Sequence, residues 1–180
     1  MKKPIKILAV SVLAMSVSLF VLSIGFQISG IYINTTPSLP VGFYKVADGP
    51  VVSGAYVAFC PPRNEVFDMA KDRFYINPGD CPGGYGLLLK RVFAQSGDTV
   101  SIDQAGIFVN GKHLPNSTQL TADAEGQPLP QYHLDQRVLD DSEYLLLSDL
   151  NPQSFDARYF GLIVRDQIQQ VVRPVFTWSH

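Results

Sequence analysis

The chain of 180 residues lacks any repeated unit. No period of about 20 to 50 residues recurs, no heptad pattern is sustained and no low-complexity tract interrupts the sequence. These absences exclude a solenoid, a coiled coil and a long disordered linker. The 13 prolines and 14 glycines are spread through the chain as turn markers. The length suits one domain, or one domain with an elaborated insert.

Histidine is scarce, which argues against a metal centre. His113, His133 and His180 are scattered, without spacing of i and i+4 and without a neighbouring cysteine. We therefore expect three solvated histidines, no metal and no other cofactor.

Cysteine is scarcer still. Cys60 and Cys81 each stand beside a proline, in "AFCPPR" and "GDCPGG". In an oxidising compartment such a pair most simply forms a disulfide, which here would close a loop of about 20 residues and contribute roughly 3 kcal/mol. A catalytic thiol is the weaker alternative, because no histidine is near either cysteine and no CxxC spacing is present.

Basic residues are also in short supply, with 14 Lys and Arg against 16 Asp and Glu. Three of the basic residues, Lys2, Lys3 and Lys6, stand together at the N-terminus, so the rest of the chain is clearly acidic. Binding to nucleic acid needs a basic face that neutralises phosphates. We therefore expect no nucleic-acid partner.

Residues 7–26, "ILAVSVLAMSVSLFVLSIGF", contain no charged side chain. Twenty helical residues at about 1.5 Å each cross a hydrocarbon core of about 30 Å, so this run predicts one transmembrane helix. Lysines precede the run and no basic residue follows it before Lys45, which predicts a cytoplasmic segment at residues 1–6 and an exported domain at residues 27–180. A cleaved signal peptide is the alternative, although the apolar run is long and no clear A-x-A site follows it.

Strand patterns dominate the exported part. Short β-branched or aromatic runs bounded by Gly and Pro, and one nearly continuous apolar run at residues 85–95, predict strands. The other runs lie at residues 42–48, 54–60, 98–103, 107–114, 143–149, 159–164 and 168–178. The pattern predicts a mainly β fold, an antiparallel sheet with a barrel-like character.

Three further segments complete this expectation. Asn110-Gly111 predicts a type I′ hairpin, since both positions of that turn need positive φ. Residues 115–137 are polar and punctuated by prolines, so we expect a surface insert. Only residues 64–73 favour a short soluble helix.

Lys90 is the unusual residue of the apolar run "LLLKRVF". A lysine there either extends its amine to the surface or loses its proton, because burial without a partner lowers its pKa. A neutral lysine can act as a general base for a serine hydroxyl. The alternative is an ordinary lysine of an edge strand.

Three segments in this order, "NTTPSLPVGFY", "LLKRVFAQSGDTV" and "SDLNPQSFDARYFGLI", resemble the type I signal peptidases (peptidase S26). The first segment resembles most closely the conjugal-transfer, TraF-like branch of that family. The likeness spans roughly residues 34–164. One departure is "AQSGD", with Ser96 where the family commonly has proline; Gly97 and Asp98 remain, so we expect the turn to be kept.

The resemblance implies a Ser-Lys dyad. Ser38 would be the nucleophile, on a loop stiffened by Pro37 and Pro40, and Lys90 would be the general base. The backbone N–H of Ser38, with the Thr36 hydroxyl, would stabilise the oxyanion.

The resemblance also assigns supporting residues to "SFDARYFG". Ser154 would orient the lysine amine, and Asp156 would pair with Arg158 to brace that corner of the fold. In the conjugal branch an aspartate of this motif is itself counted as catalytic. The resemblance therefore leaves two roles open for Asp156, catalytic or bracing. An ordinary structural salt bridge is compatible with both.

The implied function is that of a membrane-anchored serine endopeptidase in the bacterial inner membrane, with its catalytic domain in the periplasm. Its partners would be exported precursor proteins such as conjugative pilin, bound as an added strand with small residues at P1 and P3. Hydrolysis and circularisation both stay open as outcomes. An alternative is a non-catalytic periplasmic subunit of a type IV secretion assembly. A self-cleaving repressor would need a DNA-binding module, which the N-terminus does not offer.

Overall fold

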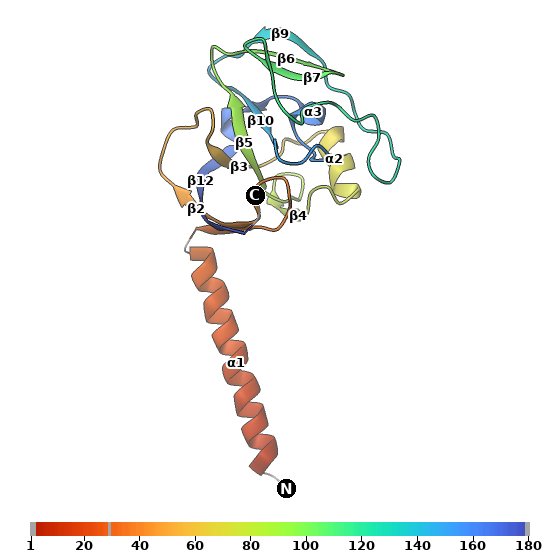
Figure 1. Cartoon of the computed structure of the whole chain (residues 1–180). Coiled ribbons are helices and arrows are strands. Elements are labelled where there is room, and N and C mark those ends of the chain that lie inside the picture. Colours follow the sequence, from red (N-terminus) through yellow and green to blue (C-terminus); the bar gives the residue numbers. More distant parts are fainter. Residues whose placement is uncertain (1–2, 29, 179–180) are drawn as a thin grey trace. The chain divides into compact units, whose positions relative to one another are not determined.

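The computed structural model describes residues 3–28 and 30–178, and the chain divides into two compact units, residues 1–32 and 33–180 (Figure 1). The first unit contains α1 (Lys3–Ile28), so the segment predicted to be helical is helical. Within the described residues, however, no helix combines the length and apolar character that a membrane crossing requires. The predicted transmembrane helix at residues 7–26 is therefore not supported.

The second unit is mainly β. After α1 the elements are, in chain order, β1 (Ile31–Asn34), β2 (Gly42–Ala47), β3 (Tyr56–Phe59), α2 (Glu65–Asp72), β4 (Pro78–Cys81), β5 (Leu88–Ala94), β6 (Thr99–Asp103), β7 (Gly106–Val109), β8 (Lys112–His113), β9 (Leu134–Val138), β10 (Glu143–Leu147), α3 (Ala157–Phe160), β11 (Ile163–Val164), the 3-10 turn Arg165–Gln167 and β12 (Ile168–Thr177). In the described part of the chain, seven strands form one sheet in the order β1-β2-β12-β3-β5-β10-β11, and four form a second in the order β8-β7-β6-β9.

The strand pairs with a defined register are antiparallel, which confirms the predicted fold class. β5 lies inside the large sheet, between β3 and β10. Its burial alternates so that Lys90, Val92 and Ala94 are buried, because successive side chains of a strand point to opposite faces. Lys90 is therefore not a lysine of an edge strand.

β10 pairs with only part of β5. The register joins Leu145 to Ala94 and Leu147 to Arg91, with a bulge after Leu145, and β10 then ends. On the opposite side, β3 pairs with residues 88–91 of β5. Within these pairings, residues 88–90 have a strand neighbour on the β3 side alone.

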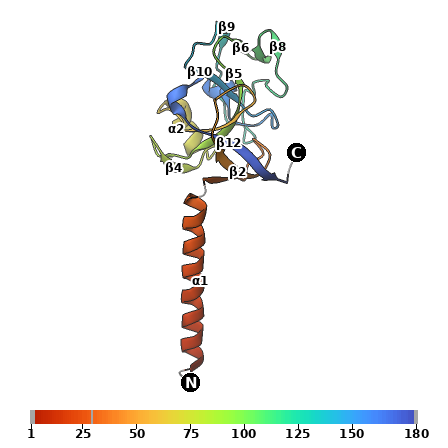
Figure 2. The same cartoon turned by 90° about the vertical axis from the view of Figure 1, so that its left-hand side faces the viewer.

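The small sheet lies at one end of the second unit, as Figures 1 and 2 both show. Its hairpin turns at Asn110 and Gly111, whose φ angles of 52° and 76° fit the predicted type I′ turn. The predicted insert at residues 115–137 needs correction at its end, because β9 begins at Leu134 and pairs with β6. The sequence signal failed there because β9 is almost wholly exposed and has no apolar alternation.

The predicted helix at residues 64–73 is confirmed, and the predicted strand at residues 159–164 is corrected. α2 fits the predicted segment, and the Asn64 side chain caps it by accepting a hydrogen bond from the Phe67 N–H at 3.0 Å. Residues 159–164, predicted as a strand, instead contain the end of α3 and the short β11. The reason is local, because the Asp156 side chain caps α3 and Gly161, at φ 76°, ends it.

The main core lies between the large sheet and the two helices. Phe67 of α2 packs against Phe155 and Phe160, with ring centroids 5.9 and 5.1 Å apart. These contacts fix the segment that carries Asp156. Cys60, after β3, and Cys81 of β4 form the predicted disulfide, with their Cα atoms 5.4 Å apart.

Candidate active site

Ser38 lies in a turn between β1 and β2, which we call the Ser38 loop (residues 34–40). The buried Asn34 side chain holds this loop: its Nδ2 donates to the carbonyl oxygens of Leu39 at 3.0 Å and Pro40 at 3.2 Å. Its Oδ1 accepts from the Thr36 N–H at 3.3 Å. The two prolines alone do not account for the loop, and sequence reasoning missed Asn34 as its internal brace.

Thr36, predicted to assist at the oxyanion, is an exposed member of the same loop. Its hydroxyl donates to Asn34 Oδ1 at 3.0 Å. A hydroxyl has one proton, so Thr36 would have to turn away from Asn34 to serve an oxyanion.

Lys90 is 4% exposed, and its amine donates a hydrogen bond to Ser148 Oγ at 2.8 Å. Burial lowers the pKa of Lys90 from 10.5 to about 8, since an ammonium loses hydration there; the charge of Asp156 partly opposes this and that of Arg158 adds to it. A large share of these amines is thus uncharged near pH 8.

Ser148 is fully buried directly after β10, and sequence reasoning missed it. Leu147 lies opposite Arg91 in the antiparallel pairing, so the chain delivers the next residue, Ser148, to Lys90. The Ser148 N–H donates to Asp156 Oδ2 at 3.1 Å. The signal that could have found it is the strand register, which is shifted by a bulge at Phe93 of β5, opposite Leu145 and Leu146.

Ser154 was predicted to orient the lysine amine. It is buried, and its hydroxyl donates to Ser38 Oγ at 3.0 Å. The segment after β10 thus supplies one serine to each member of the predicted dyad: Ser148 contacts Lys90, and Ser154 contacts Ser38.

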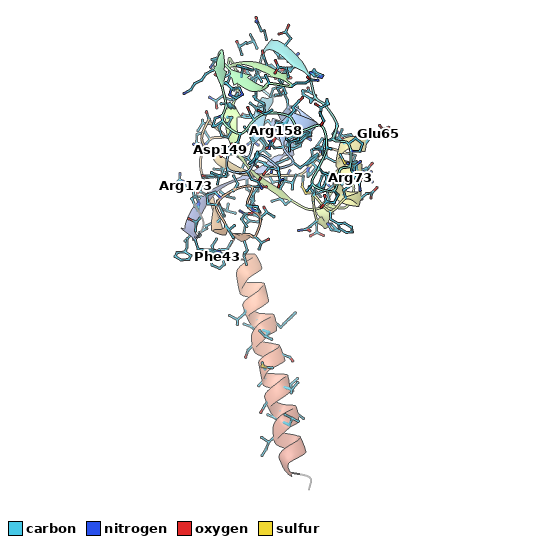
Figure 3. All side chains as sticks on the ribbon, turned by 45° about the vertical axis from the view of Figure 1, so that its right-hand side comes forward. Phe43, Glu65, Arg73, Asp149, Arg158 and Arg173 are labelled. Carbon is cyan, nitrogen blue, oxygen red and sulfur yellow. A yellow bond between two sulfur atoms is a disulfide. The ribbon has the colours of Figure 1, made fainter. Side chains whose placement is uncertain are left out.

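Asp156 and Arg158 form the predicted ion pair. Both are fully buried, and the guanidinium donates to Oδ1 and Oδ2, each at 2.8 Å. Figure 3 shows Arg158 among the packed side chains inside the unit, whereas Glu65 and Arg73 lie at its rim. Burial alone would lower the pKa of Arg158, but the hydrogen bonds and charge of Asp156 outweigh it and raise that pKa.

Arg158 also donates to the carbonyl oxygens of Ser154 at 2.8 Å and Asn116 at 3.0 Å. Arg158 therefore connects the segment after β10, which carries Ser148 and Ser154, to the start of the insert. We call the group of Lys90, Ser148, Asp156 and Arg158 the lysine corner.

Two cavities meet at Ser38. The first, of about 160 Å³, is lined by Lys90, residues 87–89 of the β5 segment and residues 33–36; we call it the Lys90 cavity. The second, of about 310 Å³, is lined by Ser154, Tyr159 and part of the insert; we call it the insert cavity. Ser38 thus shares one cavity with the buried amine and opens on its Ser154 side into another.

A family model described as signal peptidase, peptidase S26, matches residues 3–178. The chain belongs to the peptidase S26 family. This confirms the resemblance that the three motifs predicted.

Two relatives of this S26 chain are named as transfer proteins. A plasmid transfer protein TraF from Escherichia coli is 47% identical over 178 residues, covering 99% of this chain and 100% of the relative. A conjugal transfer protein TraF from Agrobacterium fabrum is 35% identical, covering 84% of this chain and 85% of the relative. A crystal structure of a signal peptidase I from Enterococcus faecalis aligns with a TM-score of 0.40 and 21% identity, covering 70% of this chain and 98% of that one.

The two described histidines, His113 and His133, line neither of the two cavities. The His113 ring lies against Phe108 at an interplanar angle of 58°, and its Nε2 is 3.2 Å from the Ala105 carbonyl oxygen. His133 lies in the insert. His180 falls outside the described residues. Among the residues described, no three His, Cys, Asp or Glu side chains are arranged to hold a metal ion.

Proposed function

We propose that this S26 peptidase is a serine endopeptidase with Ser38 as nucleophile and Lys90 as general base. The observation that carries the proposal is the pairing of a half-buried hydroxyl and a buried amine on one cavity. A base with a pKa near the working pH is the most effective, and the amine of Lys90 meets that condition at about 8.

The chemistry follows from these two groups. The Ser38 Oγ attacks the carbonyl carbon of the scissile bond while the Lys90 amine takes the hydroxyl proton. The resulting tetrahedral intermediate expels the amine of the leaving peptide, which receives that proton from Lys90. Water, or a second amine, then attacks the Ser38 ester, and Lys90 accepts and returns a proton once more.

The supporting residues have separate tasks in this proposal. Ser148 would fix the direction of the Lys90 amine, and Ser154 would hold Ser38 until the substrate arrives. Asp156 would act on Lys90 through the Ser148 backbone and through its charge. The Ser38 N–H would bind the oxyanion, joined by Thr36 once its hydroxyl leaves Asn34.

The substrate would bind as an extended strand. Residues 88–90 of β5 have no strand neighbour on the β10 side within the described pairings, and the Lys90 cavity is lined by this same stretch. Backbone pairing there gives affinity, while the small cavity limits the side chains. We therefore expect small residues such as Ala at P1 and P3.

The names of the relatives, plasmid transfer and conjugal transfer proteins, extend the proposal to conjugation. The substrate would be an exported precursor, such as a pilin, with a linear or circular product. The Cys60–Cys81 disulfide favours an oxidising compartment, so we propose a periplasmic domain. The proposed place of action is the bacterial inner membrane.

The test is precursor processing by the full chain carrying Ser38→Ala or Lys90→Ala, followed by mass spectrometry of the precursor. Each variant should lose processing, while circular dichroism and the disulfide are retained. The matched control is Ser53→Ala, an exposed serine remote from both cavities. Processing retained by either dyad variant would overturn the proposal.

A further inference from the structure

The insert cavity has walls of its own. It shares Thr36, Ser38, Tyr75 and Phe155 with the Lys90 cavity, but its remaining walls come from the insert and from the segment after β10. The two cavities therefore diverge from Ser38. One reaches the buried amine and the unpaired stretch of β5, whereas the other reaches Asp123, Glu125 and Ser154.

The insert is held firmly where it lines this cavity. The Tyr75 hydroxyl donates to Asp123 Oδ2, and Arg73 donates to the Pro128 carbonyl oxygen at 2.8 Å. The Leu120 N–H donates to the Tyr159 hydroxyl at 3.2 Å. Figure 1 shows the insert running beside α2, the helix that Arg73 follows. These contacts make the wall a built feature of the fold.

An extended substrate needs space on both sides of its scissile bond. On the proposed function, the acyl side occupies the Lys90 cavity, because the strand edge that would pair with it lies there. The carbonyl carbon must lie at Ser38, so the peptide after the scissile bond continues from that point. Of the two cavities that reach Ser38, only the insert cavity then remains for it.

We propose that the insert cavity is the subsite for the residues that follow the scissile bond. Its lining is mostly apolar, from Leu120, Ala122, Leu129 and Phe155, and it carries two acidic side chains, Asp123 and Glu125. The subsite therefore takes an apolar side chain next to the bond and tolerates a cationic residue beyond it. Acidic residues are disfavoured, since like charges repel. The inference rests on the proposed function.

The test compares peptides that share the same sequence before the scissile bond and differ only in the residues after it. Lys in place of Glu in the second position after the bond should raise kcat/KM by about fivefold, the size expected of an exposed charge pair. Glu125→Lys should abolish or reverse that preference. Asp135→Lys, an equally exposed charge change on β9 outside both cavities, should keep it.

Ala124→Trp provides a second approach, because Ala124 is exposed on the rim and a bulky ring there would fill the cavity. This variant should slow peptides with a large apolar residue after the bond. The loss of kcat/KM should be much smaller for an activated ester that has the same acyl side and a small alcohol as leaving group.

The outcomes separate the two proposals. One outcome is that Glu125→Lys and Ala124→Trp hydrolyse every peptide with the kcat/KM of the unmodified chain, while Ser38→Ala is inactive. In that case the subsite proposal is wrong and the proposed peptidase function is retained. If Ser38→Ala hydrolyses the peptides as fast as the unmodified chain, the proposed function itself fails.

Discussion

The two members of the proposed dyad are held in opposite ways. Ser38 is half-buried on a short loop, and its brace, Asn34, lies four residues away in sequence. Lys90 is buried inside a sheet, and its partner, Ser148, lies 58 residues away. The backbone of the Ser38 loop is therefore held mainly by local contacts, although Ser154 donates to the Ser38 hydroxyl from far along the chain, whereas the contact of Lys90 with Ser148 exists only in the folded sheet.

This difference separates two tasks: the loop positions the Ser38 hydroxyl, and the lysine corner lowers the pKa of the Lys90 amine. Local hydrogen bonds and prolines keep the hydroxyl in place at little entropic cost, but they leave it accessible to a substrate. The buried corner removes water from the amine and lowers its pKa, at the cost of burying Asp156 and Arg158 as well. Perturbing the buried ion pair of the corner should hence affect stability first, whereas perturbing Ser148 or the loop should affect turnover more than stability.

The largest effect should come from Arg158→Met. The variant leaves the fully buried Asp156 without its cation and removes a donor from four backbone carbonyls, those of Asn116, Asn151, Pro152 and Ser154. We expect the free energy of unfolding to fall by about 3–5 kcal/mol, measured by urea denaturation.

Arg137→Met is the matched control, because Arg137 pairs with Glu143 at 2.7 Å while its own side chain is 47% exposed. Such a surface pair should contribute far less to the free energy of unfolding than the buried pair does, because solvent screens it. Equal losses in the two variants would mean that the corner is not the buried support described above.

The pH dependence of stability tests the state of Lys90 directly. Its pKa is about 8 in the folded chain against 10.5 as its ordinary value. Between these values the unfolded chain carries one more proton at this site, so the free energy of unfolding rises with pH by about 3 kcal/mol. Below about pH 8 the folded chain bears the full cost of the buried charge.

Lys90→Met removes this titration and serves as the reference. The difference in unfolding free energy between the unmodified chain and Lys90→Met should change across this window and level off on either side of it. A constant difference from pH 7 to pH 11 would show that the amine titrates as an exposed lysine does.

The contrast also explains what the sequence could predict. Most of the strand patterns, the Asn110-Gly111 turn, the α2 segment and the cysteine pair are local signals that the structure confirms. The motifs of the resemblance identified the segments of the site. Sequence reasoning missed Ser148 because its position depends on the register of β10 against β5 and on a bulge in that pairing. Residues 159–164 were misread because the cap and the glycine of α3 outweighed their strand propensity.

Ser148→Ala should produce an intermediate effect, on turnover more than on folding. Loss of the hydroxyl frees the Lys90 amine to rotate, so kcat should fall by about 10- to 100-fold with KM little changed. The hydroxyl also accepts a hydrogen bond from the ammonium form, so its loss should lower the pKa of Lys90 and move the rising limb of the pH–rate profile to lower pH. A slower enzyme with an unmoved profile would reduce Ser148 to a packing role.

The smallest effect should come from Asn34→Ala in the Ser38 loop. Water can replace part of the lost hydrogen bonds, so we expect a loss of only about 1 kcal/mol in the free energy of unfolding. Because the loop positions the nucleophile, kcat should still fall, by about three- to tenfold. Asn64→Ala is the matched control: it removes the cap of α2, far from Ser38 in sequence and outside both cavities, and should cost a similar amount of stability. If both variants lowered kcat equally, lost stability alone would explain the effect, and the loop would have no special role in placing the hydroxyl.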